Sequence, residues 1–200
     1  MDTVLSLTSI CFYGKLPWVG DFIARNIDFA QQQKIDHWLS DGLFELRDKD
    51  ENWLDSYLSA PVCKFILPAG VWSELPVCGA VMPSVDKVGR YFPFILFFNV
   101  EHADILLRSK YLDGIATLLP GFLQHEILPE QISEHIVKNL NSPIVTLAAD
   151  EAEALNNFIS AKDETGYWWQ LDEGKVLGFC SLPDRELFIG LFGSAYQCCN

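Results

Sequence analysis

The segment Met82–Val100, MPSVDKVGRYFPFILFFNV, joins a polar turn to the most apolar run of the chain. Its second half has aromatic or aliphatic side chains at nearly every position, without the alternation of a half-exposed strand. Such a run is typical of a strand that is covered on both faces. Pro93 cannot donate a hydrogen bond to a neighbouring strand, so we expect it near the start of the strand. The sequence therefore predicts a central buried strand over Phe92–Val100.

A polar turn lies immediately before this strand and places charged side chains beside a glycine. A strand holds such a turn in place, and loops positioned by a rigid scaffold often form binding surfaces. The candidate partner-binding or structural residues of this turn are Ser84, Asp86, Lys87 and Arg90.

A second candidate loop follows the short β-prone segment Ser9–Tyr13 and is punctuated by turn-forming glycine and proline residues. We expect the two loops to meet at one end of the sheet, with Asp21 or Asp86 paired to Arg90. In one interpretation the pair only braces the loop, and in the other the braced loop is also a docking surface. The candidate residues of the second loop are Lys15, Asp21 and Phe22.

The rest of the chain predicts further helices and strands around this centre. Asp28, with Gln31 three residues later, has the pattern of a helix N-cap. A single α/β domain over 1–200 is expected, with a mixed β-sheet packed between helix layers in a three-layer sandwich. The predicted helices are 28–47, 51–59, 103–119, 129–140 and 150–160; the predicted strands are 62–67, 77–82 and 144–147, followed by a C-terminal β-meander within 165–192 that contains strands 167–171, 176–180 and 187–191.

Composition narrows the class of protein. The net charge of −13 argues against nucleic acid and anionic membrane as main partners. No apolar stretch reaches the roughly 18 residues that span a bilayer, and no signal peptide is recognisable, so we expect a cytoplasmic protein without membrane insertion. The six cysteines include no CxxC pair, which indicates reduced thiols. The Cys198–Cys199 tail is expected to be frayed.

Motifs for common chemistries are missing from the sequence. There is no Walker loop, GxGxxG, GxSxG or HExxH, and the four histidines form no cluster with metal-ligand spacing. We therefore expect no cofactor, no metal and no enzyme activity. The alternative is a small enzyme in which Asp21, Asp86 and Arg90 hold a phosphorylated or metal-bound ligand between two carboxylates and a cation.

Trp168 and Trp169 are adjacent in a predicted strand, so their side chains face opposite ways. One is expected in the core, and the other covers a helix or is exposed. An exposed tryptophan would be a candidate interface residue.

Three segments together resemble the TagF family, also called ImpM: Phe12–Pro17, Gly20–Phe22 and above all Pro83–Pro93, PSVDKVGRYFP. The resemblance implies a cytosolic α/β protein, with a mixed sheet between helix layers, that is an accessory to a bacterial type VI secretion system. It implies post-translational repression through a scaffold protein with a forkhead-associated domain. The family supplies no catalytic residues to transfer to this chain.

Overall fold

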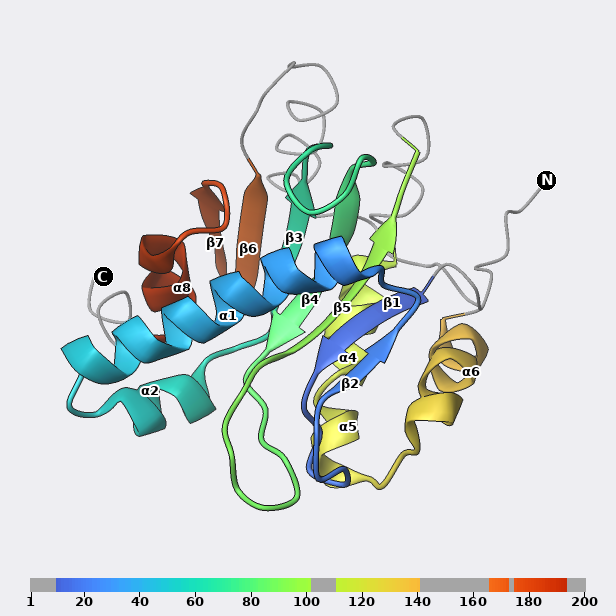
Figure 1. Cartoon of the computed structure of the whole chain (residues 1–200), viewed down its shortest axis with the longest axis horizontal. Coiled ribbons are helices and arrows are strands. Elements are labelled where there is room, and N and C mark those ends of the chain that lie inside the picture. Colours follow the sequence, from blue (N-terminus) through green and yellow to red (C-terminus); the bar gives the residue numbers. More distant parts are fainter. Residues whose placement is uncertain (1–9, 102–110, 141–165, 173–174, 194–200) are drawn as a thin grey trace.

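The computed structural model describes residues 10–101, 111–140, 166–172 and 175–193, which form one sheet between two layers of helices (Figure 1). The strands are β1 (Ile10–Gly14), β2 (Ile23–Arg25), β3 (Cys63–Leu67), β4 (Val77–Met82), β5 (Phe94–Asn99), β6 (Tyr167–Asp172) and β7 (Lys175–Cys180). The helices are α1 (Phe29–Lys49), α2 (Trp53–Ser59), α4 (Leu112–Leu118), α5 (Gly121–Gln124), α6 (Pro129–Asn139) and α8 (Arg185–Phe192).

The seven strands have the order β2-β1-β5-β4-β3-β6-β7. The expected α/β domain with a sheet between helix layers is confirmed. The expected mixed pairing is corrected, because every pair of neighbouring strands in the described sheet is antiparallel. Short connections such as those between β1 and β2 or between β3 and β4 suit antiparallel pairs, whereas parallel pairs need a long crossover.

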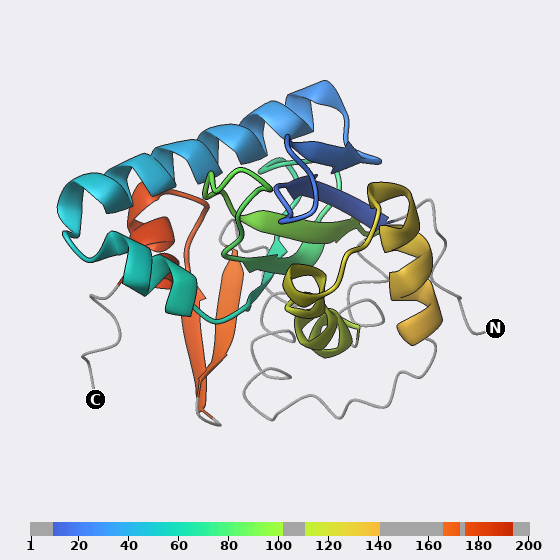
Figure 2. The same ribbon diagram turned by 90° about the horizontal axis from the view of Figure 1, so that it is seen from below.

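Strand β5 lies inside the sheet between β1 and β4, and both of its faces are buried. Phe94, Leu96 and Phe98 point toward the layer of α4, α5 and α6. Ile95 and Phe97 point toward the layer of α1, α2 and α8. The two layers lie on opposite sides of the sheet in Figure 2. The predicted interior strand is therefore confirmed, and its side chains contribute to the hydrophobic cores on both faces of the sheet.

Helix α1 begins as the sequence predicts, because the Asp28 carboxylate accepts a hydrogen bond of 2.8 Å from the Gln31 N–H. The predicted strand at 187–191 is wrong, because these residues lie in helix α8. The expected three-stranded meander is therefore a two-stranded hairpin followed by a helix. Asp184 caps α8 by accepting a hydrogen bond of 2.7 Å from the Leu187 N–H. The apolar residues of α8 recur at helical spacing and pack against α1.

Some predicted elements lie wholly or partly outside the described residues. These are the strand 144–147, the helix 150–160, the first half of the helix 103–119 and the Cys198–Cys199 tail. The short strand β2 was not predicted. Among the described residues, no helix has the length and apolar character that crossing a membrane requires.

The tryptophan pair of β6 faces opposite ways, as expected. Trp168 is 1% exposed and packs on the α1 side, with its ring centroid 5.2 Å from that of Trp38. Trp169 is buried in the other core. Both tryptophans are buried, so neither is the exposed interface residue that the sequence analysis considered.

Candidate functional site

The two candidate loops meet at one end of the sheet. Strands β1 and β5 are neighbours, and Gly14 at the end of β1 lies opposite Phe94 at the start of β5. The adjoining loops touch directly, since the Lys87 N–H donates to the Val19 carbonyl at 3.0 Å. The Arg90 Nη2 donates to the Gly20 carbonyl at 2.6 Å. The predicted meeting of the loops is confirmed.

An ion cluster of Lys15, Asp86 and Arg90, centred on the buried Asp86 carboxylate, holds the loops together. The Asp86 side chain is 0% exposed, and its Oδ2 accepts from Lys15 Nζ at 3.0 Å and from Arg90 Nε at 2.6 Å. Lys15 is 6% exposed in its side chain, whereas Arg90 is 55% exposed. Asp86 is thus the carboxylate that pairs with Arg90, and Lys15 is a partner that the sequence did not predict.

The charged state of Asp86 is favoured by its hydrogen bonds. Burial by itself raises the pKa of the Asp86 carboxyl, because it removes water from the charged form. Hydrogen bonds from the Arg90 N–H, the Lys15 side chain, the Arg90 side chain and the Val88 N–H outweigh this effect. Together they hold the pKa of Asp86 well below its usual range, so this carboxylate is ionised at neutral pH.

Backbone geometry fixes the shape of the turn around Asp86. Its Oδ1 accepts from the Val88 N–H at 3.0 Å and from the Arg90 N–H at 2.8 Å. The Gly89 N–H donates to the Asp86 carbonyl at 3.0 Å, and Gly89 has a φ of 86°. Glycine adopts this left-handed conformation without the strain that a Cβ would add. The side chain and backbone of Asp86 therefore impose one conformation on residues 86–90.

Ser84 links the cluster to helix α2. Its N–H donates to the Tyr57 hydroxyl at 2.8 Å, and that hydroxyl donates to the Ser84 carbonyl at 3.0 Å. The Ser84 hydroxyl donates to the Lys15 carbonyl at 2.7 Å. Burial raises the pKa of Tyr57 above its ordinary value, so the hydroxyl remains a donor. Ser84 acts as a structural connection between the two loops and α2.

The two touching loops expose four side chains that we together call the docking tip: Phe22, Lys87, Val88 and Arg90. Phe22 is 42% exposed and Val88 is 69% exposed, although both are apolar. The Phe22 ring stacks on Tyr13 at 5.5 Å and meets Phe92 edge-on at 4.8 Å. Lys15 Nζ lies 4.7 Å from the centre of the same ring. Phe22 therefore covers the ion cluster and remains partly open to solvent.

Asp21 has a different position from the other candidate residues. It is exposed, and its carboxylate accepts a hydrogen bond of 2.8 Å from the Phe22 N–H. It braces its own loop, as the structural interpretation expected, and the structure does not place it in the ion cluster.

Two residues that anchor the loops, Tyr57 and Trp18, are not predicted from the sequence. The Trp18 indole N–H donates to the Phe122 carbonyl at 3.0 Å and ties the loop to α5.

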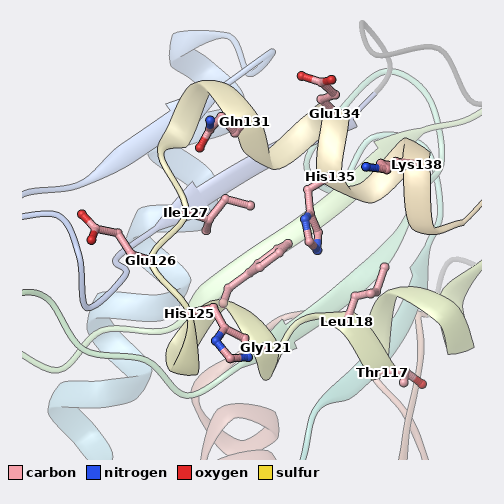
Figure 3. A pocket seen from close by; sticks show the side chains of 11 residues that line it. Thr117, Leu118, Gly121, His125, Glu126, Ile127, Gln131, Glu134, His135 and Lys138 are labelled. Atoms are coloured by element: carbon pink, nitrogen blue, oxygen red, sulfur yellow. The ribbon is translucent and has the colours of Figure 1, made fainter.

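A separate cleft of about 530 Å³ lies between α4, α5 and α6. Figure 3 shows the His135 side chain directed into it from α6, whereas the Glu134 carboxylate points away. The His135 ring meets Phe122 edge-on, with centroids 5.7 Å apart. Within the described residues, no group of three or more His, Cys, Asp or Glu could hold a metal ion.

Comparisons with known proteins agree with this architecture. A crystal structure of the protein PA0076 from Pseudomonas aeruginosa PAO1 is similar to this chain, with a TM-score of 0.72 and 26% sequence identity. The similarity covers 92% of this chain and 94% of that chain. A comparison with curated proteins finds no match. Residues 11–138 match the family model of the type VI secretion system-associated TagF N-terminal domain. The chain therefore belongs to the TagF family and is a type VI secretion system-associated protein.

Proposed function

We propose that this protein is a cytoplasmic regulator that represses the type VI secretion machine by binding its scaffold protein, the one with a forkhead-associated domain. The docking tip is the proposed contact surface. Family membership supports the link to secretion. The observation that carries the binding role is the exposure of Phe22 and Val88 on loops that buried hydrogen bonds hold in one shape.

Exposed apolar side chains on loops of fixed shape favour binding to a partner. A partner that buries them gains hydrophobic free energy, and the fixed loops lose little conformational entropy on binding. Aromatic and arginine side chains are also enriched among residues that dominate binding energy. The docking tip combines these properties in Phe22 and Arg90.

The chemistry of the ion cluster favours this proposal over the enzymatic alternative. Asp86 has no exposed side-chain surface, and its two oxygens accept from two backbone N–H groups and two cations. A metal ion or a substrate proton would have to displace these donors. Asp86 is therefore better suited to support a binding surface than to transfer protons or ligate a metal.

The test is Arg90→Ala, assayed by capture of the scaffold from cells and by secretion. A folded variant that releases the scaffold and raises secretion supports repression through the docking tip. Lys138→Ala on α6 is the matched control, because it also removes one exposed cation. Normal scaffold capture and normal repression by Arg90→Ala would show that the docking surface lies elsewhere. Failure of the wild-type chain to capture the scaffold would overturn the proposed partner.

A further inference from the structure

The docking tip differs in charge from the protein that carries it. The whole chain has a formal net charge of −13. In the turn 86–90, however, the exposed charged side chains are the cations Lys87 and Arg90, and the carboxylate of Asp86 is buried against Lys15. Asp21 in the neighbouring loop adds one exposed carboxylate. The tip therefore presents an excess of positive charge on an acidic molecule.

The cations of the tip lie beside its apolar side chains. Val88 is 69% exposed and directly follows Lys87 in the turn. Arg90 reaches across to the Gly20 carbonyl, two residues before Phe22. A matching surface must therefore supply both negative charge and an apolar side chain. An acidic protein segment with an interspersed aliphatic or aromatic residue has this composition.

Other anionic partners match the tip less well. Anionic membranes attract clusters of about four to eight Lys or Arg residues, and the turn offers two. Arginine binds both phosphates and carboxylates, often through two parallel N–H donors. In Arg90, Nε already donates to Asp86 and Nη2 to Gly20, so these two nitrogens are engaged within the protein. A free phosphate has no apolar part to pack on Phe22 and Val88, whereas an acidic protein segment supplies both carboxylates and apolar side chains.

We propose that the docking tip binds an acidic segment of a protein partner, in which carboxylates face Lys87 and Arg90 and an apolar side chain packs on Phe22 and Val88. This inference rests on the proposed function and adds the chemistry of the partner surface. Electrostatic attraction at the rim accelerates association, and apolar contact at the centre slows dissociation.

The first experiment uses a synthetic peptide of alternating glutamate and leucine, added to the isotope-labelled full chain and followed by NMR. We expect the amide signals of Gly20, Val88 and Gly89 to shift with this peptide and not with its glutamine counterpart. The shifts should shrink as salt is added. Equal shifts with both peptides, shifts confined to other regions, or a larger response to anionic lipid vesicles would overturn the inference.

The second experiment compares two charge reversals. Lys87→Glu should weaken affinity for the acidic peptide at least about fivefold, because it places a carboxylate at the rim of the contact. Lys138→Glu on α6 makes the same change in charge away from the tip and should stay within about twofold of wild type. Equal effects of the two variants would contradict the inference.

The purified scaffold separates the two proposals. If the acidic peptide shifts the tip but the wild-type chain does not bind the scaffold, the proposed function is wrong and the acidic-partner inference holds. If the scaffold binds and Lys87→Glu binds it as tightly as Lys138→Glu does, the inference is wrong and the proposed function holds. If Lys87→Glu binds the scaffold more weakly than wild type does, and Lys138→Glu binds it as tightly as wild type, both proposals are supported.

Discussion

Replacing Asp86 by asparagine tests the ion cluster, because the substitution preserves the size of the side chain and removes its charge. Lys15, with 6% of its side chain exposed, would then lack a buried counter-charge. The new amide group would also place a donor or a weaker acceptor opposite Lys15 Nζ and Arg90 Nε. Breaking a buried pair by removal of one partner costs about 3–5 kcal/mol. We expect a loss of this size in the free energy of unfolding.

For a chain of this length, such a loss lowers the melting temperature by about 6–20 °C. The measurement is urea unfolding followed by tryptophan fluorescence, with thermal unfolding as a second probe. Asp21→Asn is the matched control, since it makes the same chemical change at an exposed carboxylate and should stay within about 0.5 kcal/mol of wild type. A loss below about 1 kcal/mol for Asp86→Asn would refute a structural role for the cluster.

Two extensions sharpen this test. Adding Lys15→Met to Asp86→Asn should restore part of the stability, because it removes the unpaired buried cation. The pH dependence follows from the depressed pKa of Asp86 in the folded protein. Its contribution is present above the unfolded pKa of about 3.9 and is lost as pH falls below that value toward the folded pKa. The stability difference between wild type and Asp86→Asn should therefore shrink below about pH 4.

Four further outcomes are expected. Phe97→Ala should cost about 3–5 kcal/mol, since Phe97 is 0% exposed in β5; an unchanged melting temperature would show that its packing contributes little. Gly89→Ala should cost about 1–2 kcal/mol through its φ of 86°, measured by urea unfolding; no loss would mean that the turn relaxes. Denatured, non-reduced protein should titrate six thiols; two or fewer would disprove a reduced state. The protein should not turn over generic phosphatase, esterase or nucleotide substrates; activity that survives repurification and disappears with Asp21→Asn would favour an enzyme.

The sequence predicts the centre of the fold well because local patterns there agree with tertiary packing. The unbroken apolar run of β5 has no polar face, and in the structure both faces of the strand are buried. The N-cap at Asp28 is a local interaction between a side chain and a backbone N–H three residues later. Signals of this kind depend on neighbouring residues alone, so they can be recognised without the fold.

Helix α8 shows where local patterns mislead. The run LFIGLF has the apolar density of a buried strand, and short apolar segments do not distinguish strand from helix by periodicity alone. The helix packs against α1, where a Cβ at Gly42 would lie 2.2 Å from the Phe188 ring. Gly42 therefore allows α1 and α8, which are distant in the sequence, to pack closely. The signal that could have predicted the helix is the N-cap at Asp184.

The candidate site was predicted in part. Glycine and charged residues in the sequence indicate both loops, and they allow either Asp86 or Asp21 to pair with Arg90. Lys15 was not assigned as the buried partner, because its distance of 71 residues from Asp86 in the chain gives no local pattern. Its position directly after the buried strand β1 was the available signal.

The central claim is that the docking tip binds the scaffold. The most direct test is calorimetric titration of the purified forkhead-associated-domain scaffold with wild-type protein and, in parallel, with Val88→Asp. Val88 is 69% exposed, so its replacement should leave the melting temperature unchanged. A carboxylate at this position would remove apolar contact and repel an acidic partner. The account predicts an affinity at least about tenfold weaker than wild type. Equal affinity of Val88→Asp and wild type would contradict it.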